Sequence, residues 1–83
     1  MNILLKPGLR ISEQGTLFDP ETGDSFTMNE TGLVILRYLQ EGITPDQVYD
    51  RLSQEFILNV EGFKRMLIDF KALLNSFQLL QHE

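Results

Sequence analysis

The stretch that most constrains the fold of this chain spans residues 15–42, with the sequence GTLFDPETGDSFTMNETGLVILRYLQEG. Residues 16–19 are short and β-prone. The segment DPETG at 19–23 has the composition of a hairpin loop, because Pro presets φ and Gly accepts a positive φ. Residues 25–28 alternate small polar and apolar side chains, as the two faces of a strand do. The stretch therefore predicts a β-hairpin, and Asn29 directly after it can cap a helix.

Three helices are predicted, near residues 30–40, 45–56 and 60–76. The first follows the capping residue Asn29, the second follows the capping box TPDQ, and the third opens near Asn59. Apolar side chains recur at helical spacing in all three. The predicted core contains Phe26, Ile35, Leu39, Leu52, Phe56, Phe63, Leu67, Phe70 and Leu74, and Val60 extends its stripe on the third helix. Gly32 is interpreted as a small residue that lets the first helix approach a neighbour closely.

A further strand is predicted at residues 9–13, where apolar and polar side chains alternate. With the hairpin it forms a three-stranded meander, and one of the outer strands must be a free edge. Residues 1–8 form a leading segment whose apolar residues either make an edge strand or pack on the core. The predicted fold class is α+β, a three-stranded antiparallel sheet followed by three helices, in a single domain of residues 1–83.

Composition excludes several classes of protein. The 83 residues carry a net charge of −5 and include no Cys, which excludes a disulfide framework, a thiolate metal site and a cysteine nucleophile. A chain without Cys is compatible with a reducing cytoplasm, where we expect this protein to lie. The first ten residues lack the apolar run of a signal peptide or membrane helix, so no membrane association is expected. The negative charge disfavours nucleic acid as a partner.

Residues suited to catalysis are scarce. The single His, His82, is next to last in the chain, where ends usually fray, and no phosphate-binding or metal-binding motif is present. Asp46 with Asp50, and Arg65 with Asp69, share helix faces at a spacing typical of a solvated surface. We therefore predict a protein that is not an enzyme, with no catalytic residues, no cofactor and no metal.

One motif resembles a known family. Its residues are Met28, Asn29, Glu30, Thr31 and Gly32, followed by Ile35, Leu36, Leu39 and Gly42. They resemble the core pattern LN-x-T-[GA]-x-x-I-L-x-x-L-x-x-G of the PqqD-like family, small domains that bind the leader segments of ribosomally made peptides. Such domains are also called RiPP recognition elements. The resemblance covers roughly residues 9–81 and implies a winged-helix-like fold and a peptide-chaperone role in natural product biosynthesis.

The resemblance also implies partners and a site. The partners are the leader of a precursor peptide and a separate maturation enzyme or leader protease that receives it. The hairpin resembles stand-alone members of lasso-peptide pathways, although radical-SAM and quinone-cofactor pathways stay open. The third strand, 25–28, would accept the leader as an added strand, and the third helix would wall the groove. The implied peptide-binding residues are Ser25, Phe26, Thr27, Met28, Lys64, Met66, Leu67, Phe70, Lys71 and Leu73.

Several details of that site stay open at this level. Lys64 or Lys71 would meet acidic residues of a leader, whereas Met66 and Leu73 fit the core equally well. Many relatives carry an Asp at or beside the position of Met66. Relatives also carry a Gly before the closing Leu pair, where this chain has Phe77-Gln78. Of Ser25 and Thr27, one is expected to direct its backbone N–H towards the open edge.

The alternative function is that of a winged-helix DNA-binding protein, in which the third helix would enter a groove of the duplex. Lys64, Arg65 and Lys71 are basic, but most of their neighbours are apolar, whereas a groove-reading helix needs polar side chains towards the base edges. A structural or oligomerising module is the third possibility. Recognition of a leader peptide is the function that we predict.

Overall fold

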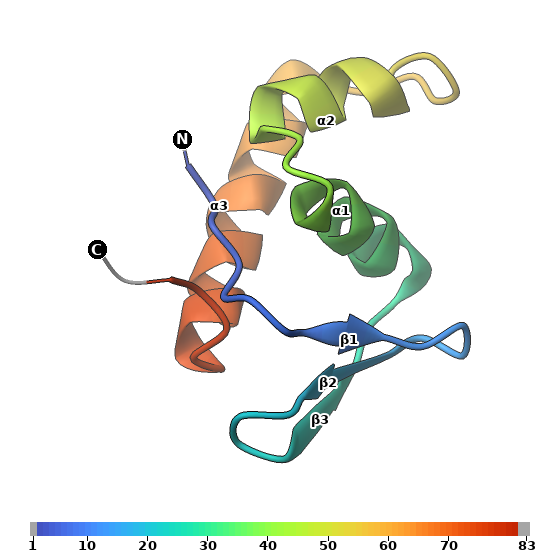
Figure 1. The fold of residues 1–83 in the computed structure, drawn as a ribbon. Coiled ribbons are helices and arrows are strands. Elements are labelled where there is room, and N and C mark those ends of the chain that lie inside the picture. The colour runs from blue at the N-terminus through green and yellow to red at the C-terminus, as the bar shows by residue number, and fades with distance from the viewer. Residues whose placement is uncertain (1, 82–83) are drawn as a thin grey trace.

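The computed structural model describes residues 2–81, so His82 lies outside the described range. Its antiparallel sheet has the strand order β1–β2–β3, and three helices follow the sheet in the chain (Figure 1). The elements are β1 (Arg10–Ile11), β2 (Thr16–Asp19), β3 (Asp24–Thr27), α1 (Glu30–Gln40), α2 (Pro45–Leu52) and α3 (Val60–Ser76). The predicted α+β class, with three strands before three helices, is confirmed.

Glycines with positive φ close both hairpins. Gly15 has a φ of 92° and donates its N–H to the carbonyl of Ser12 at 3.2 Å. Gly23 has a φ of 81° and donates to the carbonyl of Asp19 at 2.8 Å. β1 is shorter than the predicted 9–13, because the Ser12 hydroxyl accepts a hydrogen bond from the N–H of Thr16 at 3.0 Å and so belongs to the turn.

The helices begin where their capping residues predict. Asn29 and Asn59 each accept a hydrogen bond from the backbone N–H three residues on, at 2.7 and 2.8 Å. Thr44 and Gln47 form a complete capping box, each side chain accepting from the other's backbone N–H, at 3.3 and 3.1 Å. These bonds satisfy N–H groups that have no partner inside the helix.

α2 ends at Leu52, four residues before the predicted end. The hydroxyl of Ser53 donates to the carbonyl three residues earlier at 2.9 Å, a local bond that competes with continued helix. Tyr49, rather than Phe56, packs against Phe63, with ring centroids 5.3 Å apart. Phe56 is consequently 57% exposed, and its predicted place in the core is wrong.

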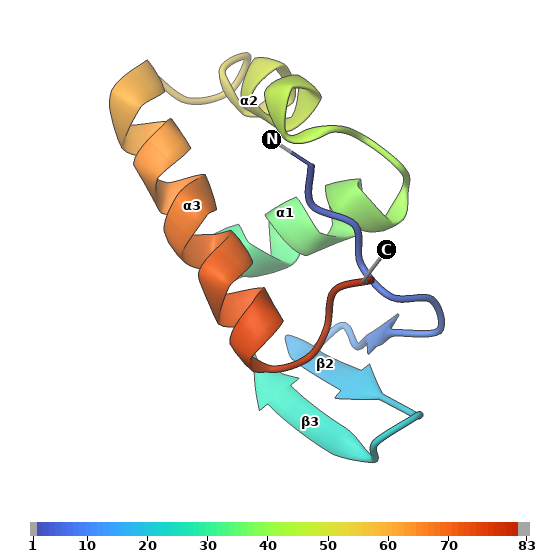
Figure 2. The same ribbon diagram turned by 90° about the vertical axis from the view of Figure 1, so that its left-hand side faces the viewer.

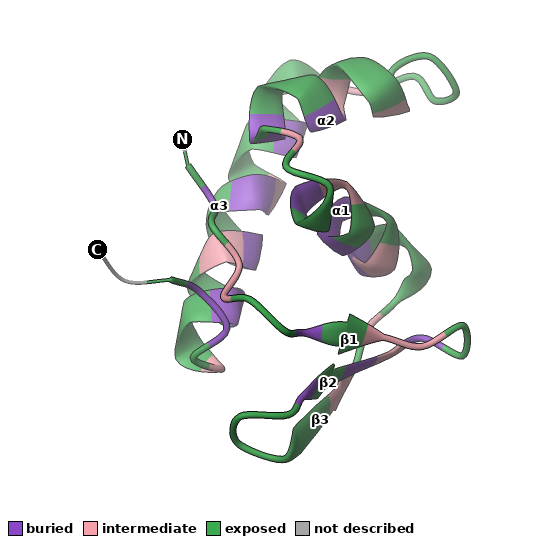
Figure 3. Ribbon diagram, viewed as in Figure 1, coloured by how far each residue is buried: buried purple, intermediate pink, exposed green. Residues whose placement is uncertain are grey.

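The core lies among the three helices, the inner face of the sheet and the segment after α3 (Figure 3). Its completely buried apolar residues are Leu17, Ile35, Leu36, Val48, Leu74 and Leu79. The predicted core residues Ile35, Leu39, Phe63, Leu67, Phe70 and Leu74 are all buried. Phe26 and Leu52 are only half-buried, and Val60 is 45% exposed because it lies in the first turn of α3.

The leading segment packs on the core. Ile3 is buried, and Leu5 forms an isolated antiparallel bridge with Leu80. Lys6 extends from this segment to the sheet, where its Nζ lies 2.7 Å from Oδ2 of Asp19. Asp19 is only 1% exposed, and the hydrogen bond from Lys6 is the main cause that lowers the pKa of its carboxyl. The ion pair therefore joins the start of the chain to the β2–β3 hairpin.

Candidate functional site

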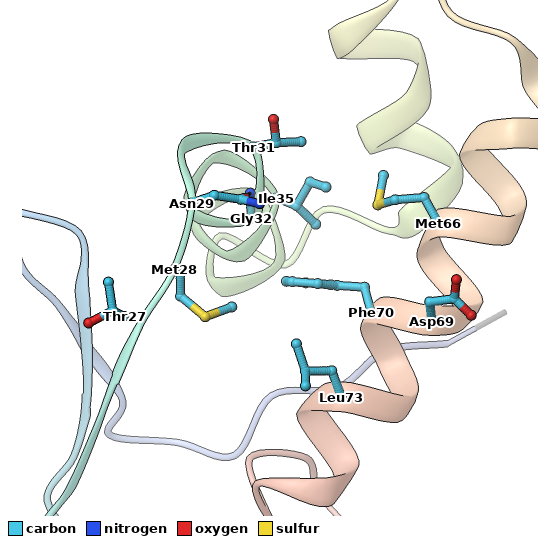
Figure 4. A pocket seen from close by; sticks show the side chains of 10 residues that line it. All are labelled: Thr27, Met28, Asn29, Thr31, Gly32, Ile35, Met66, Asp69, Phe70 and Leu73. Carbon is cyan, nitrogen blue, oxygen red and sulfur yellow. Dashed lines mark hydrogen bonds between the residues drawn. The ribbon is translucent and has the colours of Figure 1, made fainter.

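α3 runs from α2 at one end to β3 at the other (Figure 2). Between α3 and the junction of β3 with α1 lies a hollow of about 360 Å³, which we call the junction groove (Figure 4). This volume falls within the range of about 300–1,000 Å³ that is usual for ligand pockets. The groove is lined by Thr27, Met28, Asn29, Thr31, Gly32, Ile35, Met66, Asp69, Phe70 and Leu73.

The small residue Gly32 of α1 faces α3 across the base of the groove. A Cβ atom at this position would lie 3.5 Å from Cε1 of Phe70 and 3.6 Å from Cε of Met28. A larger side chain would therefore fill the space between the two helices. Gly32 thus faces Phe70 at the base of the junction groove, and the close approach expected there stays a prediction.

The walls of the groove are apolar and partly open to solvent. Ile35 and Phe70 are buried, Met28 and Met66 are half-buried, and Leu73 is 43% exposed. Side chains from both walls point into the hollow in Figure 4. Covering such surface removes apolar area from water, which stabilises a complex. The two Met side chains can adapt their shape to what covers them.

Asp69 is the charged residue among those that line the groove. Its carboxylate is exposed, and Thr31 lies across the hollow on α1 (Figure 4). Asp69 lies three residues after Met66 and four before Leu73, a spacing that places all three on one side of α3. Asp69 is exposed, as its interpretation as solvated surface predicts, and it also lines the groove, which the sequence analysis did not predict.

The outer edge of β3 is free, and its hydrogen-bonding groups can be assigned. Met28 donates its N–H to the carbonyl of Gly15 at 3.1 Å, and Phe26 pairs with Leu17 two residues earlier along the same ladder. Because hydrogen-bonded pairs alternate with non-bonded pairs in an antiparallel ladder, Ser25 and Thr27 direct their N–H and C=O groups outward.

The neighbouring strand supports the same assignment. Thr16, which lies opposite Thr27, directs its carbonyl away from β3, towards Ser12 directly after β1, whose N–H donates to it at 2.9 Å. The expectation that only one of Ser25 and Thr27 faces outward is wrong, because residues two apart in a strand share the same direction. The open edge of β3 thus offers two N–H groups in succession.

The free edge and the groove lie side by side. Phe26 of β3 stacks on Phe77 at the end of α3, with ring centroids 4.5 Å apart and an interplanar angle of 22°. Thr27 belongs to both features, since it directs its N–H outward and also lines the groove. An extended chain along β3 would therefore have α3 beside it.

Five of the ten residues implied by the family resemblance do not line the groove: Ser25 and Phe26 lie on β3 beside it, and three residues of α3 lie elsewhere. Leu67 is a core residue, and Lys64 and Leu67 line a different cavity, between α2 and α3. Lys71 is half-buried and does not line the junction groove either. At about 100° per residue, Lys64 and Lys71 lie on the opposite side of α3 from Met66 and Leu73. The structure therefore gives the lysines no place in the groove.

Within residues 2–81, no group of three or more His, Cys, Asp or Glu side chains is arranged to hold a metal ion. The helices of this part of the chain are also too short or too polar to cross a membrane. The chemistry of the groove is therefore that of an apolar surface beside open backbone donors and acceptors.

Comparison with known proteins identifies the family. Residues 14–78 match the family described as coenzyme PQQ synthesis protein D (PqqD). The chain belongs to the PqqD family. The match includes β2, β3, all three helices and the whole junction groove, and it confirms the resemblance seen in the motif after β3. No curated protein matches the chain.

Two solved structures share the fold of this PqqD-family domain. One is TbiB1 in complex with the TbiA(beta) leader peptide, at 23% sequence identity, with 98% of each chain covered and a TM-score of 0.82. The other is lasso peptide synthetase B1 complexed with the leader peptide, at 20% identity. It covers 99% of this chain and 100% of that one, with a TM-score of 0.78.

Proposed function

We propose that this domain binds the leader segment of a ribosomally synthesised precursor peptide and presents it to a separate maturation enzyme or leader protease. The observation that carries the proposal is the free edge of β3 beside the junction groove. An extended peptide can join an exposed strand through its backbone and place alternate side chains in neighbouring pockets. Membership of the PqqD family supports this function, as do the two structural neighbours, both of which hold leader peptides.

The edge supplies the sequence-independent part of the binding. Ser25 and Thr27 each offer an outward N–H and C=O, so a peptide strand can form paired hydrogen bonds at both positions. Each bond contributes roughly 0.5–1.5 kcal/mol net, because it replaces bonds to water. This ladder fixes the position and direction of the peptide and tolerates most side chains.

The groove supplies the selective part. A peptide side chain that points towards α3 meets Met28, Met66, Phe70 and Leu73. An apolar side chain gains from burial there, whereas a charged one loses its hydration without a partner. The proposed peptide-binding residues are therefore Ser25, Phe26, Thr27, Met28, Met66, Phe70 and Leu73. No catalytic step is assigned to any of them, because binding and presentation require none.

The test is a calorimetric titration with a synthetic peptide that carries the leader of the cognate precursor, identified first by pull-down with this protein. Thr27→Pro removes the outward N–H, while Thr27→Val keeps it. We expect the Pro variant to bind at least roughly tenfold more weakly, a loss of about 1.4 kcal/mol, and the Val variant to bind like the parent.

A second matched pair tests the groove. Met66→Asp places a carboxylate in the apolar wall and should weaken binding strongly, whereas Met66→Leu should have little effect. Circular dichroism and thermal melts establish that each variant is folded. If the Pro and Asp variants both fold and bind the peptide as the parent does, the peptide binds elsewhere and the proposal is wrong.

A further inference from the structure

The connection between α2 and α3 carries an apolar surface that the fold does not use. Phe56 is 57% exposed, Ile57 is 105% exposed and Val60 is 45% exposed, all within five residues. We call these three side chains the corner patch. Connections normally run over the surface with polar side chains, and clustered exposed apolar residues mark surfaces that bind other proteins.

A cavity of about 230 Å³ between α2 and α3 adjoins the corner patch. Val60 belongs to both, and the rings of Tyr49 and Phe63 lie at the cavity with their centroids 5.3 Å apart. The hydroxyl of Tyr49 donates to the carbonyl of Leu58 at 3.4 Å, which holds the connection against α2. Val60 is thus the residue through which the patch adjoins the cavity.

The rim of this cavity is more acidic than basic. Asp46 and Asp50 line it from α2, and Lys64 lines it from α3. Neither carboxylate forms an ion pair with any of residues 2–81, so both are available to cations from outside. A partner with apolar side chains flanked by Lys or Arg is complementary to this surface. A second copy of this acidic chain is not, because two such rims would repel each other.

The corner patch lies away from the peptide site. The cavity takes Val60, Phe63, Lys64 and Leu67 from the first half of α3, next to α2, whereas the groove takes Met66, Asp69, Phe70 and Leu73 from farther along the helix, towards β3 (Figure 2). A partner on the corner patch would therefore not compete with a peptide in the groove. Both surfaces can be occupied at the same time.

We infer that the corner patch and its cavity are the docking surface for the enzyme that acts on the bound peptide, through apolar side chains flanked by Lys or Arg. This inference rests on the proposed function, which requires that an enzyme meet the domain while the leader is still bound. A surface at the α2 end of α3, displaced along the helix from the groove, fulfils that requirement. The domain then acts as a bridge between peptide and enzyme.

The test uses two probes, the synthetic leader peptide and the purified maturation enzyme or leader protease that acts on the same precursor. Ile57→Asp is the main variant, because a fully exposed side chain has no buried contact to lose. Ile68→Asp is its matched control, since Ile68 is 56% exposed on α3 but lies outside the patch. We expect Ile57→Asp to weaken enzyme binding at least roughly tenfold and Ile68→Asp to leave it unchanged.

The charged rim has its own pair of variants. Asp46→Asn combined with Asp50→Asn should weaken enzyme binding and reduce its dependence on salt, because two of the attracting charges are gone. Glu13→Gln, which removes an exposed charge from the β1–β2 turn, should change neither quantity. Binding of the leader peptide should be unchanged in all of these variants.

The outcomes separate this inference from the proposed function. If Ile57→Asp binds the enzyme like the parent, the docking surface is wrong, while leader binding that depends on Met66 still supports the proposed function. If Ile57→Asp instead weakens leader binding, the patch is part of the peptide site and the inference falls. Sedimentation could show that the parent self-associates and that Ile57→Asp abolishes this association. That result would assign the corner patch to a second copy of the chain and would also overturn the inference.

Discussion

Phe26 and Phe77 stack with their ring centroids 4.5 Å apart, and this contact joins the free-edge strand to the end of the helix beside it. The two residues are 51 positions apart in the chain and come from β3 and the C-cap of α3. Both are half-buried, so the pair lies where the sheet, α3 and solvent meet. The stack therefore helps to set the distance between the edge and the groove wall.

We predict that the two rings are energetically coupled. In a double-mutant cycle with Phe26→Ala and Phe77→Ala, the coupling should be about 0.5–1.5 kcal/mol in the free energy of unfolding. Phe77→Leu, which keeps apolar volume but not the stack, should be less destabilising than Phe77→Ala. Both alanine variants should also weaken leader binding, because β3 is less firmly held. Additive effects of the two alanine substitutions would show that the stack contributes no energy of its own.

Gly32 and Gly62 form a natural matched pair, each three residues after a capping Asn. A Cβ on Gly62 would meet only Asn59, at 3.5 Å or more. A Cβ on Gly32 would lie 3.2 Å from Oδ1 of Asn29 and in contact with Phe70. We expect Gly62→Ala to stabilise the fold by up to about 1 kcal/mol, as Ala usually does in a helix.

Gly32→Ala should stabilise the fold less than Gly62→Ala does, or should destabilise it. The added methyl group at residue 32 crowds the capping side chain of Asn29 and contacts Phe70. Denaturant unfolding of the two variants measures the difference. An equal increase in stability at both positions would show that the added methyl group at residue 32 is not crowded by Asn29 and Phe70.

The Lys6–Asp19 ion pair predicts how stability depends on pH. The hydrogen bond from Lys6 lowers the pKa of Asp19 below its ordinary value of 3.8, so the unfolded chain takes up this proton first as the pH falls. The contribution of Asp19 is therefore present above about pH 3.8 and is lost below it. The same contact raises the pKa of Lys6 above 10.5, so that its contribution is lost only at higher pH.

Denaturant melts between neutral and acidic pH should show a fall in the unfolding midpoint that Asp19→Asn reduces. Asp19→Asn should also be less stable than the parent at neutral pH, since Lys6 loses its buried partner. Glu21 serves as the control, because its carboxylate is exposed and lies 3.7 Å from Lys6. If Glu21→Gln reduces the fall of the unfolding midpoint at acidic pH as much as Asp19→Asn does, the Lys6–Asp19 ion pair does not cause that fall.

The DNA-binding alternative leads to a separate prediction. The net charge is −5, and the side of α3 at the groove offers Met66, Asp69 and Leu73 rather than basic side chains. We expect no measurable binding to duplex DNA at about 150 mM salt, because few phosphates could be neutralised. Fluorescence anisotropy with a labelled duplex measures this. Submicromolar, sequence-selective binding would favour DNA recognition over the peptide function.

The sequence by itself determined the elements and the family. The turn glycines, the caps at Asn29 and Thr44 and the helical spacing of the core residues act within a few neighbouring positions, so local chemistry specifies them. For the same reason the motif after β3 was sufficient to predict the family that residues 14–78 match. The free sheet edge also followed from the strand count alone.

Only the tertiary structure decided which side chains share a surface. Periodicity shows that α3 is apolar over much of its circumference, but the packing partners determine that Met66 and Leu73 line the groove and Lys64 does not. Tyr49 packs against Phe63, and Phe56 is left exposed in the connection between α2 and α3. These outcomes depend on contacts between residues far apart in the chain, and no local pattern records where those partners lie.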